Sequence, residues 1–205
     1  MEHDRPPVST PAFWQGLYAG GEDGWELGAP APPLRAWLEA GGRLGPRVAV
    51  PGCGRGHDLR LLAGRGHAAW GFDFADTAVA AAREGAAREG VTVTVEARDV
   101  FTLADAYPGF FDAVWEYTCF CAIDPARREA YADVLAAILR PGGLLLACFY
   151  PIREGAGGPP FPVSLADIDH ALAGRFEVLE AAAPAASAER RGGLERLVLA
   201  RRPGP

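Results

Sequence analysis

The sequence predicts an α/β fold, in which a mostly parallel β-sheet carries helices on both faces. From Arg47 onward, short apolar runs alternate with longer stretches rich in alanine and leucine. That alternation is typical of strand–helix–strand units. Most of the short runs are apolar throughout, as expected of parallel strands buried on both faces. The chain has 205 residues, of which 49% are hydrophobic, and this suffices for one domain with a sizeable core.

The first half of this region predicts three strands and two helices. The strands are expected at residues 47–51, 68–72 and 91–96, and the helices at 58–64 and 75–90. A glycine loop separates the first strand from the first helix. Asp76 or Thr77 is available to cap the second helix, and Gly90 should end it, because glycine adopts the left-handed conformation that terminates helices.

The second half predicts two further parallel strands, one long helix and a closing hairpin. The strands are expected at 111–116 and 144–150, with a helix between them from Pro125 to Arg140 that the Pro141-Gly142-Gly143 sequence should end. Beyond them we expect a helix at 164–172 and strands at 176–182 and 194–200. The intervening residues 184–193 show no helical pattern, so the last two strands should pair as an antiparallel hairpin.

Residues 1–46 precede the first strand and are predicted to form a cap across the domain. They carry three of the five tryptophans, Trp14, Trp25 and Trp37, together with many prolines. A disordered tail is the alternative, but its composition would be poor in aromatic residues. We therefore expect one domain over residues 1–205, divided into the cap segment 1–46 and the core 47–205.

The charge and cysteine content exclude several classes of protein. The formal net charge is −6 and the isoelectric point is about 5.3, so the chain lacks the basic surface of a nucleic-acid-binding protein. No apolar run approaches the ~20 residues of a membrane span, and the polar N-terminus differs from a signal peptide. The four cysteines form no CxxC pair and are predicted to be reduced thiols without a metal. We expect a cytoplasmic monomer that acts on a small molecule, with neither nucleic acid nor membrane as a partner.

The segment from Val48 to His57 predicts a ligand-binding loop. A strand leads into Gly52-x-Gly54-x-Gly56, and a helix follows. Glycines in this position let the backbone approach a ligand closely. The spacing differs from the GxGxxG sequence that binds the pyrophosphate of dinucleotides. Asp58, which opens the helix, also suits a pyrophosphate poorly and favours a ligand with an amino group near the loop.

Acidic residues follow the next two predicted strands. Asp73 lies 21 residues after Gly52 (73 − 52), where a carboxylate can accept hydrogen bonds from ribose hydroxyls. Asp99 follows the third strand and can accept from an exocyclic amine, while Val100 can flank a base. Either aspartate could instead be only a helix cap. Because three such positions follow successive strands, the pattern favours an adenosine-binding site at the carboxyl edge of the sheet.

This arrangement resembles class I S-adenosylmethionine-dependent methyltransferases, whose Rossmann-like fold has a seven-stranded sheet with an antiparallel last strand. A closer resemblance is carried by Phe13-Trp14-x3-Tyr18-x6-Trp25-x2-Gly28. This segment is similar to the N-terminal signature of the thiopurine S-methyltransferase family, which includes thiol, thiocyanate and halide methyltransferases. Further similar segments are Val50–Asp58, Asp99–Thr102, Phe111–Ile123, Leu139–Gly143 and Gly158–Val163. The Pro-Gly-Cys-Gly-x-Gly-His-Asp and Cys-Phe-Cys-Ala-Ile sequences look more like the thiol and halide branch.

The resemblance implies S-adenosyl-L-methionine as the cofactor and assigns residues to it. The implied cofactor-binding residues are Trp14, Tyr18, Trp25, Gly52, Gly54, Asp73, Asp99, Val100 and Tyr117. The aromatic residues of the cap would close over the cofactor, although Tyr18 stands where a tryptophan is more usual. A sulfonium cation gains about 0.5–2 kcal/mol over an aromatic face, which gives the cap a physical reason to be aromatic. The alternative is that these rings only hold the N-terminal segment in place.

The predicted reaction is methyl transfer to a small soft nucleophile, namely a thiol, thiocyanate, a halide or a thiopurine sulfur. Such an acceptor is readily anionic, so alignment of the two reactants supplies most of the catalysis and we predict no dedicated catalytic residue. For His57, beside the loop, structural and catalytic roles stay open. The candidate substrate-binding residues are Phe13, Tyr150, Arg153 and Phe161.

Four other functions stay open at this point. The fold could serve a methyltransferase for another small molecule, or an NAD(P)-dependent oxidoreductase, although the GxGxG spacing and the lack of any lysine for a Tyr-x3-Lys proton relay count against the latter. A nucleic-acid methyltransferase would be expected to show a basic face. A cofactor-binding module without turnover is the non-enzymatic alternative.

Overall fold

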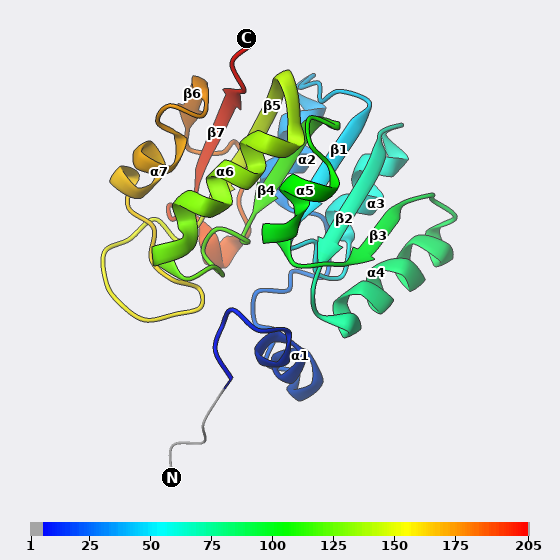
Figure 1. Cartoon of the computed structure of the whole chain (residues 1–205). Helices are drawn as coiled ribbons and strands as arrows, with labels where there is room; N and C mark the ends of the chain where they lie inside the picture. The colour runs from blue at the N-terminus through cyan, green and yellow to red at the C-terminus, as the bar shows by residue number, and fades with distance from the viewer. Residues whose placement is uncertain (1–5, 205) are drawn as a thin grey trace.

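A computed structural model describes residues 6–204 and contains one seven-stranded sheet with the order β3-β2-β1-β4-β5-β7-β6 (Figure 1). The strands are β1 Arg47–Pro51, β2 Ala68–Asp73, β3 Thr94–Ala97, β4 Phe111–Tyr117, β5 Leu139–Phe149, β6 Glu177–Ala182 and β7 Arg196–Arg201. Strands β1 to β5 pair in parallel, and β7 is antiparallel to both β5 and β6. The predicted fold class and closing hairpin are confirmed. The parts of the predicted domain and cap at residues 1–5 and 205 lie outside the described residues.

Helices cover both faces of this sheet. The α-helices are α1 Pro11–Gly20, α2 Pro32–Glu39, α3 His57–Gly64, α4 Asp76–Glu89, α5 Leu103–Ala106, α6 Arg128–Ile138 and α7 Leu165–Leu172, and the short 3-10 helices are η1 Val100–Thr102, η2 Pro125–Arg127 and η3 Glu189–Arg191. Side chains of α5, α6 and α7 contribute to the hydrophobic cluster on one face. Those of α2, α3 and α4 contribute to the cluster on the other face.

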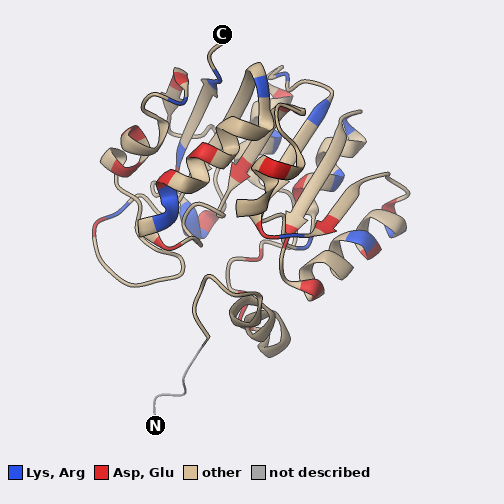
Figure 2. Ribbon diagram, in the orientation of Figure 1, with Lys and Arg blue, Asp and Glu red and all other residues tan. Residues whose placement is uncertain are grey.

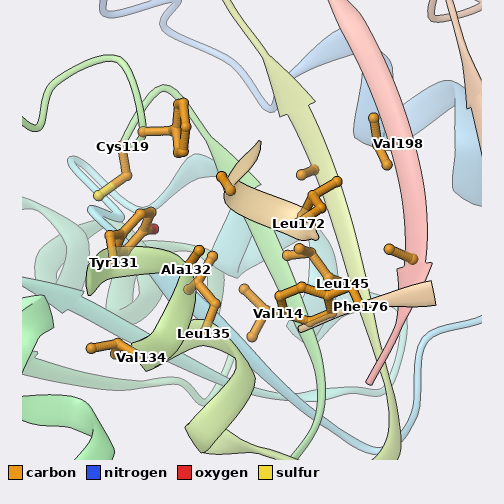
Figure 3. Close-up of a cluster of buried hydrophobic side chains, with 14 of the residues drawn as sticks. Val114, Cys119, Tyr131, Ala132, Val134, Leu135, Leu145, Leu172, Phe176 and Val198 are labelled. Carbon is orange, nitrogen blue, oxygen red and sulfur yellow. The ribbon is translucent and has the colours of Figure 1, made fainter. Parts of the chain in front are cut away.

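The central strand β4 contributes apolar side chains to both faces of the sheet. All seven of its residues are buried, and successive side chains point to opposite faces. Val114 packs in the cluster that includes Leu135 of α6 and Leu172 of α7 (Figure 3). The next residue, Trp115, lies in the opposite cluster with Leu34 of α2. Two carboxylates, Asp112 and Glu116, are buried in the same strand, and each is held by hydrogen bonds from protein groups.

The prediction of a helix up to Arg140 was wrong. Helix α6 ends at Ile138, and β5 begins at Leu139 and runs through the Pro-Gly-Gly sequence. Gly142 N–H donates to the carbonyl oxygen of Arg202, and Arg202 N–H donates to that of Gly143. Pairing with the C-terminal segment therefore recruits residues whose local preference is to end a helix.

Other predicted boundaries shift by a few residues. Helix α4 is preceded by Ala75 as its N-cap, which makes no side-chain cap, so the prediction of Asp76 or Thr77 in that role was wrong. Gly90 ends α4 with a φ of 68°, as predicted. Strand β3 begins only at Thr94, because its pairing with β2 starts opposite Trp70.

Residues 6–46 divide between two places in the molecule. Helix α1 lies beyond the carboxyl edge of the sheet (Figure 1), where Tyr18 packs against Ala75 and Ala78 at the start of α4. Helix α2 instead packs on the sheet, with Leu34 fully buried and Leu38 nearly so. Acidic and basic positions are interspersed along the ribbon (Figure 2). The longest helix has 14 residues, and within residues 6–204 no helix has the length and apolar character needed to cross a membrane.

Candidate functional site

A cavity of about 630 Å³ opens at the carboxyl edge of the sheet, beneath the N-terminal segment. Such a volume is within the range of small-molecule sites. Eleven of the thirteen predicted site residues line it: Phe13, Trp14, Tyr18, Trp25, Gly52, Gly54, Asp73, Asp99, Val100, Tyr117 and Tyr150. The structure thus brings together residues from both ends of the sequence, at the edge where ligands bind in open α/β sheets.

The glycine loop between β1 and α3 has a backbone that side chains would disturb. Gly52 has a φ of 60°, and a Cβ placed there would lie 2.9 Å from Sγ of Cys119. Gly56 has a φ of 72°, and its Cβ would lie 2.8 Å from that of Ala82. The left-handed conformation and the close approach of neighbouring chain both require glycine. These positions give the GxGxG spacing its physical reason.

Asp73 ends β2 and faces the same loop. Its Oδ2 accepts a hydrogen bond from Gly54 N–H at 3.0 Å, and its Oδ1 accepts from Ala75 N–H at 3.0 Å. Burial raises the pKa of Asp73, against the effect of these hydrogen bonds. A carboxylate fixed in this way has further lone pairs that can accept from ligand hydroxyls.

Asp99 and Val100 line the cavity at the end of β3. Oδ1 of Asp99 accepts from Phe101 N–H at 3.0 Å and so caps helix η1. Asp99 therefore does act as a helix cap, which is the alternative role that the sequence left open. It uses one carboxylate oxygen, and the other is compatible with a role in ligand binding.

Three aromatic side chains of the N-terminal segment form one cluster over the cavity. The rings of Trp14 and Trp25 lie 5.5 Å apart, and those of Tyr18 and Trp25 lie 5.4 Å apart, both edge to face. Tyr18 also has the Arg55 guanidinium over its ring at 5.6 Å. The rings therefore both hold the segment together and form a wall of the cavity, so the two roles considered from sequence are compatible.

The turn after α1 is tied to two separate parts of the core. Asp23 accepts from Arg55 of the glycine loop at 2.5 Å, and Glu26 pairs with His57 at 3.0 Å. Burial pushes the pKa of Glu26 upward, but hydrogen bonds from His57 and Gly28 N–H outweigh it, and the net shift is downward. His57 thus has a structural partner in the turn after α1.

The same turn is held from the other side by the C-terminal segment. Arg191 Nη2 donates to the carbonyl oxygen of Trp25 at 2.6 Å, and Arg190 Nη2 donates to that of Glu26 at 2.8 Å. We call residues 8–29 the lid, because they cover the cavity between these two attachments.

Asp58, at the start of α3, has a structural role. Its Oδ1 accepts from Ala31 N–H and its Oδ2 accepts from Trp115 Nε1, both at 2.7 Å. Each carboxylate oxygen therefore already has a partner in the protein. Asp58 joins the end of the lid segment to the sheet, while still lining the cavity.

The chain turns sharply after β4, below the glycine loop. Thr118 lines the cavity with a φ of 66°, which is strained for a residue with a branched side chain. The turn is fixed by Glu116, which accepts from Phe120 N–H and from the Tyr131 hydroxyl, both at 2.8 Å. Burial raises the pKa of Glu116 to about 7, in spite of these hydrogen bonds.

The far end of the cavity contains a buried arginine that the sequence interpretation missed. Arg191 is only 2% exposed, and its guanidinium lies 4.9 Å from the ring of Tyr117 and 4.8 Å from that of Tyr150. Its Nη1 is buried and has no hydrogen-bond partner among residues 6–204. A cationic donor without a partner can bind an anion in the cavity.

Tyr117 connects this arginine to a buried carboxylate. The Tyr117 hydroxyl donates to Oε1 of Glu195 at 2.6 Å, and Glu195 is 6% exposed. The adjacent arginines at 190 and 191 were the only available sequence signal. They lie in a segment without a clear secondary-structure pattern, so the sequence did not distinguish them from solvated surface residues.

Two predicted substrate residues lie away from the cavity wall. Arg153 is exposed, and neither it nor Phe161 contributes to the cavity lining. Phe161 N–H donates to the carbonyl oxygen of Cys121 at 2.7 Å, and the adjacent Pro159 and Pro160 reach the cavity instead. No cluster of three or more potential metal ligands occurs in the described part of the chain.

A sequence profile described as Thiopurine S-methyltransferase (TPMT) matches residues 9–197 of this chain. The chain belongs to the thiopurine S-methyltransferase family. It is 33% identical over 165 residues to a probable thiol methyltransferase 2 of Arabidopsis thaliana, covering 78% of this chain and 70% of that protein. It is 32% identical over 188 residues to the thiopurine S-methyltransferase of Azotobacter vinelandii, covering 84% and 86%.

Solved methyltransferases share the fold of this thiopurine S-methyltransferase family member. One is 1,6-didemethyltoxoflavin-N1-methyltransferase of Burkholderia thailandensis with bound S-adenosylhomocysteine, with a TM-score of 0.72, 20% identity, and 95% and 87% of the two chains covered. Magnesium protoporphyrin IX methyltransferase of Synechocystis, also with S-adenosylhomocysteine, gives a TM-score of 0.67, 23% identity, and 82% and 80% coverage. The protein is an S-adenosylmethionine-dependent methyltransferase of class I fold, so the predicted family, enzyme class and cofactor are confirmed.

The residues at the carboxyl edge fit this cofactor. The glycine loop offers a backbone surface that a Cβ at Gly52 would obstruct, and Asp73 stands beside it with acceptor capacity for ribose hydroxyls. The aromatic wall of the lid suits a sulfonium cation. When bound, the cofactor supplies an electrophilic methyl group, and the protein supplies the position and environment of the acceptor.

Proposed function

We propose that this protein methylates a small soft nucleophile, a thiol or a comparable anion, which binds between Tyr117, Tyr150 and Arg191. The observation that carries this proposal is the unpartnered Nη1 of Arg191, buried at the wall of the cavity. Buried cationic donors are costly unless a partner satisfies them, and an anionic sulfur or halide would do so.

The remaining cavity wall supports an acceptor of modest size. The same cavity of about 630 Å³ must hold the cofactor as well as the acceptor. Phe13, Tyr150 and Pro160 give the acceptor end an apolar and aromatic surface, which excludes water from an anionic nucleophile. The relatives named as thiol, thiocyanate and thiopurine methyltransferases support the same acceptor class.

For the cofactor we propose the contacts implied by the resemblance. Asp73 accepts from the ribose, Asp99 and Val100 contact the adenine, Gly52 and Gly54 lie beneath the methionine part, and the cluster of Trp14, Tyr18 and Trp25 covers the sulfonium. Their common position on one cavity supports this assignment. Replacing Asp73 with Ala should weaken S-adenosylhomocysteine binding by about 1–3 kcal/mol, measured by titration calorimetry.

We also propose that the protein is a cytoplasmic monomer with a single domain. Four cysteines without disulfide bonds support a reducing compartment. The net charge of −6 supports a small molecule over a nucleic acid as the partner.

An acceptor panel tests the proposal directly. Purified protein would be incubated with labelled S-adenosylmethionine and with a small alkyl thiol, an aromatic thiol, thiocyanate, iodide, and matched alcohols and amines. We expect methylation of sulfur acceptors or soft anions and none of the oxygen or nitrogen analogues. Preferential methylation of an amine or alcohol would overturn the proposal.

A further inference from the structure

At the end of β4, a tyrosine that lines the cavity is hydrogen-bonded to a buried glutamate. The Tyr117 hydroxyl lies 2.6 Å from Oε1 of Glu195, and Tyr117 lines the cavity whereas Glu195 does not. Glu195 therefore reaches the acceptor only through Tyr117. Its second oxygen, Oε2, is buried and has no hydrogen-bond partner among the described residues.

A buried carboxylate with one unused oxygen is an unusual way to fix a tyrosine. Buried polar atoms are normally satisfied, and a carboxylate with a spare acceptor retains capacity for a proton. Arg191 lies over the ring of Tyr117 at 4.9 Å, so a positive charge stands beside the position where an acceptor sulfur would bind. Arg191 and Glu195 therefore both contact Tyr117. Each has one buried polar atom, Nη1 and Oε2 respectively, without a hydrogen-bond partner among residues 6–204.

We propose that Tyr117 and Glu195 take the proton from a neutral thiol acceptor while Arg191 holds the resulting thiolate. This inference rests on the proposed thiol-methylating function and adds the route of the proton. Tyr117 is the catalytic residue, because it contacts the acceptor. Glu195 acts through Tyr117 and is a positioning residue that also stores the proton.

The step balances in atoms and charge. The thiol S–H bond breaks as its proton passes to Oη of Tyr117, whose own proton moves to Oε1 of Glu195. The thiolate sulfur then bonds to the methyl carbon, and the electron pair of the broken carbon–sulfonium bond stays on the sulfur of S-adenosylhomocysteine. Glu195 afterwards releases its proton to water, so one proton is produced for each methyl group transferred.

The groups around the pair are compatible with this role. Burial raises the pKa of Tyr117, so its hydroxyl remains protonated and able to donate to Glu195. Cys148 of β5 faces the pair and also has a pKa raised by burial, so it remains a neutral thiol. Arg191 of η3 faces Tyr117 as a cation. The neutral ring of Trp115 stacks on the ring of Tyr117, with the ring centres 5.7 Å apart. The acidic groups Glu116 and Asp58 are more remote and are held by Tyr131 and Trp115, respectively.

We expect Glu195→Gln to change kcat/KM differently for thiols and for permanently anionic acceptors. Thiocyanate carries no proton to remove, whereas a thiol with a pKa near 8.5 is mostly protonated at pH 7. Glu195→Gln keeps the size and the hydrogen-bond acceptor but cannot take the proton. The ratio of kcat/KM for thiol to kcat/KM for thiocyanate should fall about a hundredfold at pH 7, the usual scale of general base catalysis.

The pH profile separates this role from a merely structural one. In Glu195→Gln the thiol rate should rise with pH as the thiol ionises in solution, and approach that of the wild type above about pH 9. Tyr117→Phe should show the same loss at pH 7. Glu180→Gln, an exposed glutamate on β6, is the matched control and should leave the ratio as in the wild type.

Each result decides the inference. A fall in the ratio with recovery at high pH supports it. An unchanged ratio, or an equal loss with both acceptors at every pH, overturns it and leaves the proposed function intact. If the wild type methylates neither thiol nor thiocyanate, the proposed function fails, and the inference fails with it.

Discussion

Strand β4 meets arginines and a buried carboxylate at both of its ends, but the two clusters differ in how completely they are paired. At the start, Oδ1 of Asp112 accepts from Arg140 Nε at 2.7 Å, and Oδ2 accepts from the side chain and backbone N–H of Arg47, both at 3.0 Å. The two arginines remain 38% and 47% exposed. This cluster satisfies its carboxylate and keeps its cations hydrated.

In the cluster at the carboxyl end of β4, two buried polar atoms have no hydrogen-bond partner within residues 6–204. Among the residues that the structure describes, these atoms are Oε2 of Glu195 and Nη1 of the almost fully buried Arg191. Proteins tolerate such atoms where a ligand completes the pairing. We therefore propose that the first cluster stabilises the sheet and that the second is arranged for a ligand, although both use the same residue types.

The largest expected effect is at Arg191. Arg191→Gln should lower kcat/KM for an anionic acceptor about a hundredfold, because it removes the buried cation that satisfies the acceptor. Binding of S-adenosylhomocysteine, measured by titration calorimetry, would report whether the cofactor half remains intact. Arg201→Gln, at the exposed end of β7, is the matched control. If Arg191→Gln lowers kcat/KM by less than threefold, the cluster at the carboxyl end of β4 does not bind the acceptor.

The next effect concerns stability at the opposite end. Asp112→Asn should lower the free energy of unfolding by about 1.5–3 kcal/mol, because it removes charge-assisted hydrogen bonds from a buried position. Urea unfolding followed by circular dichroism measures this change, and Asp169→Asn, an exposed substitution on α7, serves as the control. Activity per folded molecule should stay within about twofold of the wild type. A loss of activity without a loss of stability would contradict a purely structural role for Asp112.

A smaller effect follows from the titration of Asp112. Burial acts to raise the pKa of Asp112, but hydrogen bonds from Arg47 and Arg140 outweigh it and hold the pKa below its usual range. Its stabilisation is therefore present above the unfolded-state pKa of about 3.9 and is lost as the pH falls through the folded-state value. The stability difference between wild type and Asp112→Asn should shrink below about pH 4. A difference that grows on acidification would show the opposite sign.

The smallest effect is expected at the lid. Asp23→Asn removes the carboxylate that pairs with Arg55, whose side chain is 35% exposed and therefore partly screened by water. We expect S-adenosylhomocysteine to bind about two- to fivefold more weakly, which corresponds to less than 1 kcal/mol. Calorimetry at low and high salt checks this, since added salt should reduce the difference. An effect of a hundredfold would place Asp23 among the main determinants of cofactor binding.

Local sequence determined most of the fold and the part of the cavity that we propose binds the cofactor. The Gly52-x-Gly54-x-Gly56 spacing reflects left-handed backbone at each glycine, which is a local property and could be recognised from the sequence. The close approach of Cys119 and Ala82, which also requires glycine, comes from the tertiary structure. Asp73 and Asp99 were predictable because parallel strands end at the same edge of the sheet. The end of α6 was not predictable, because pairing with the C-terminal residues overrides the local preference of Pro141-Gly142-Gly143.

Tertiary structure alone decided the part of the cavity that we propose binds the acceptor. Tyr117 and Glu195 are separated by 78 residues, and Trp25 and Arg191 by 166. No local pattern marks such partners, because their hydrogen bonds depend on the strand order and on the path of the segment before β7. The sequence determines which strands and loops form, since these depend on neighbouring residues, whereas the fold decides which distant charges are buried together and which of them are left for a ligand.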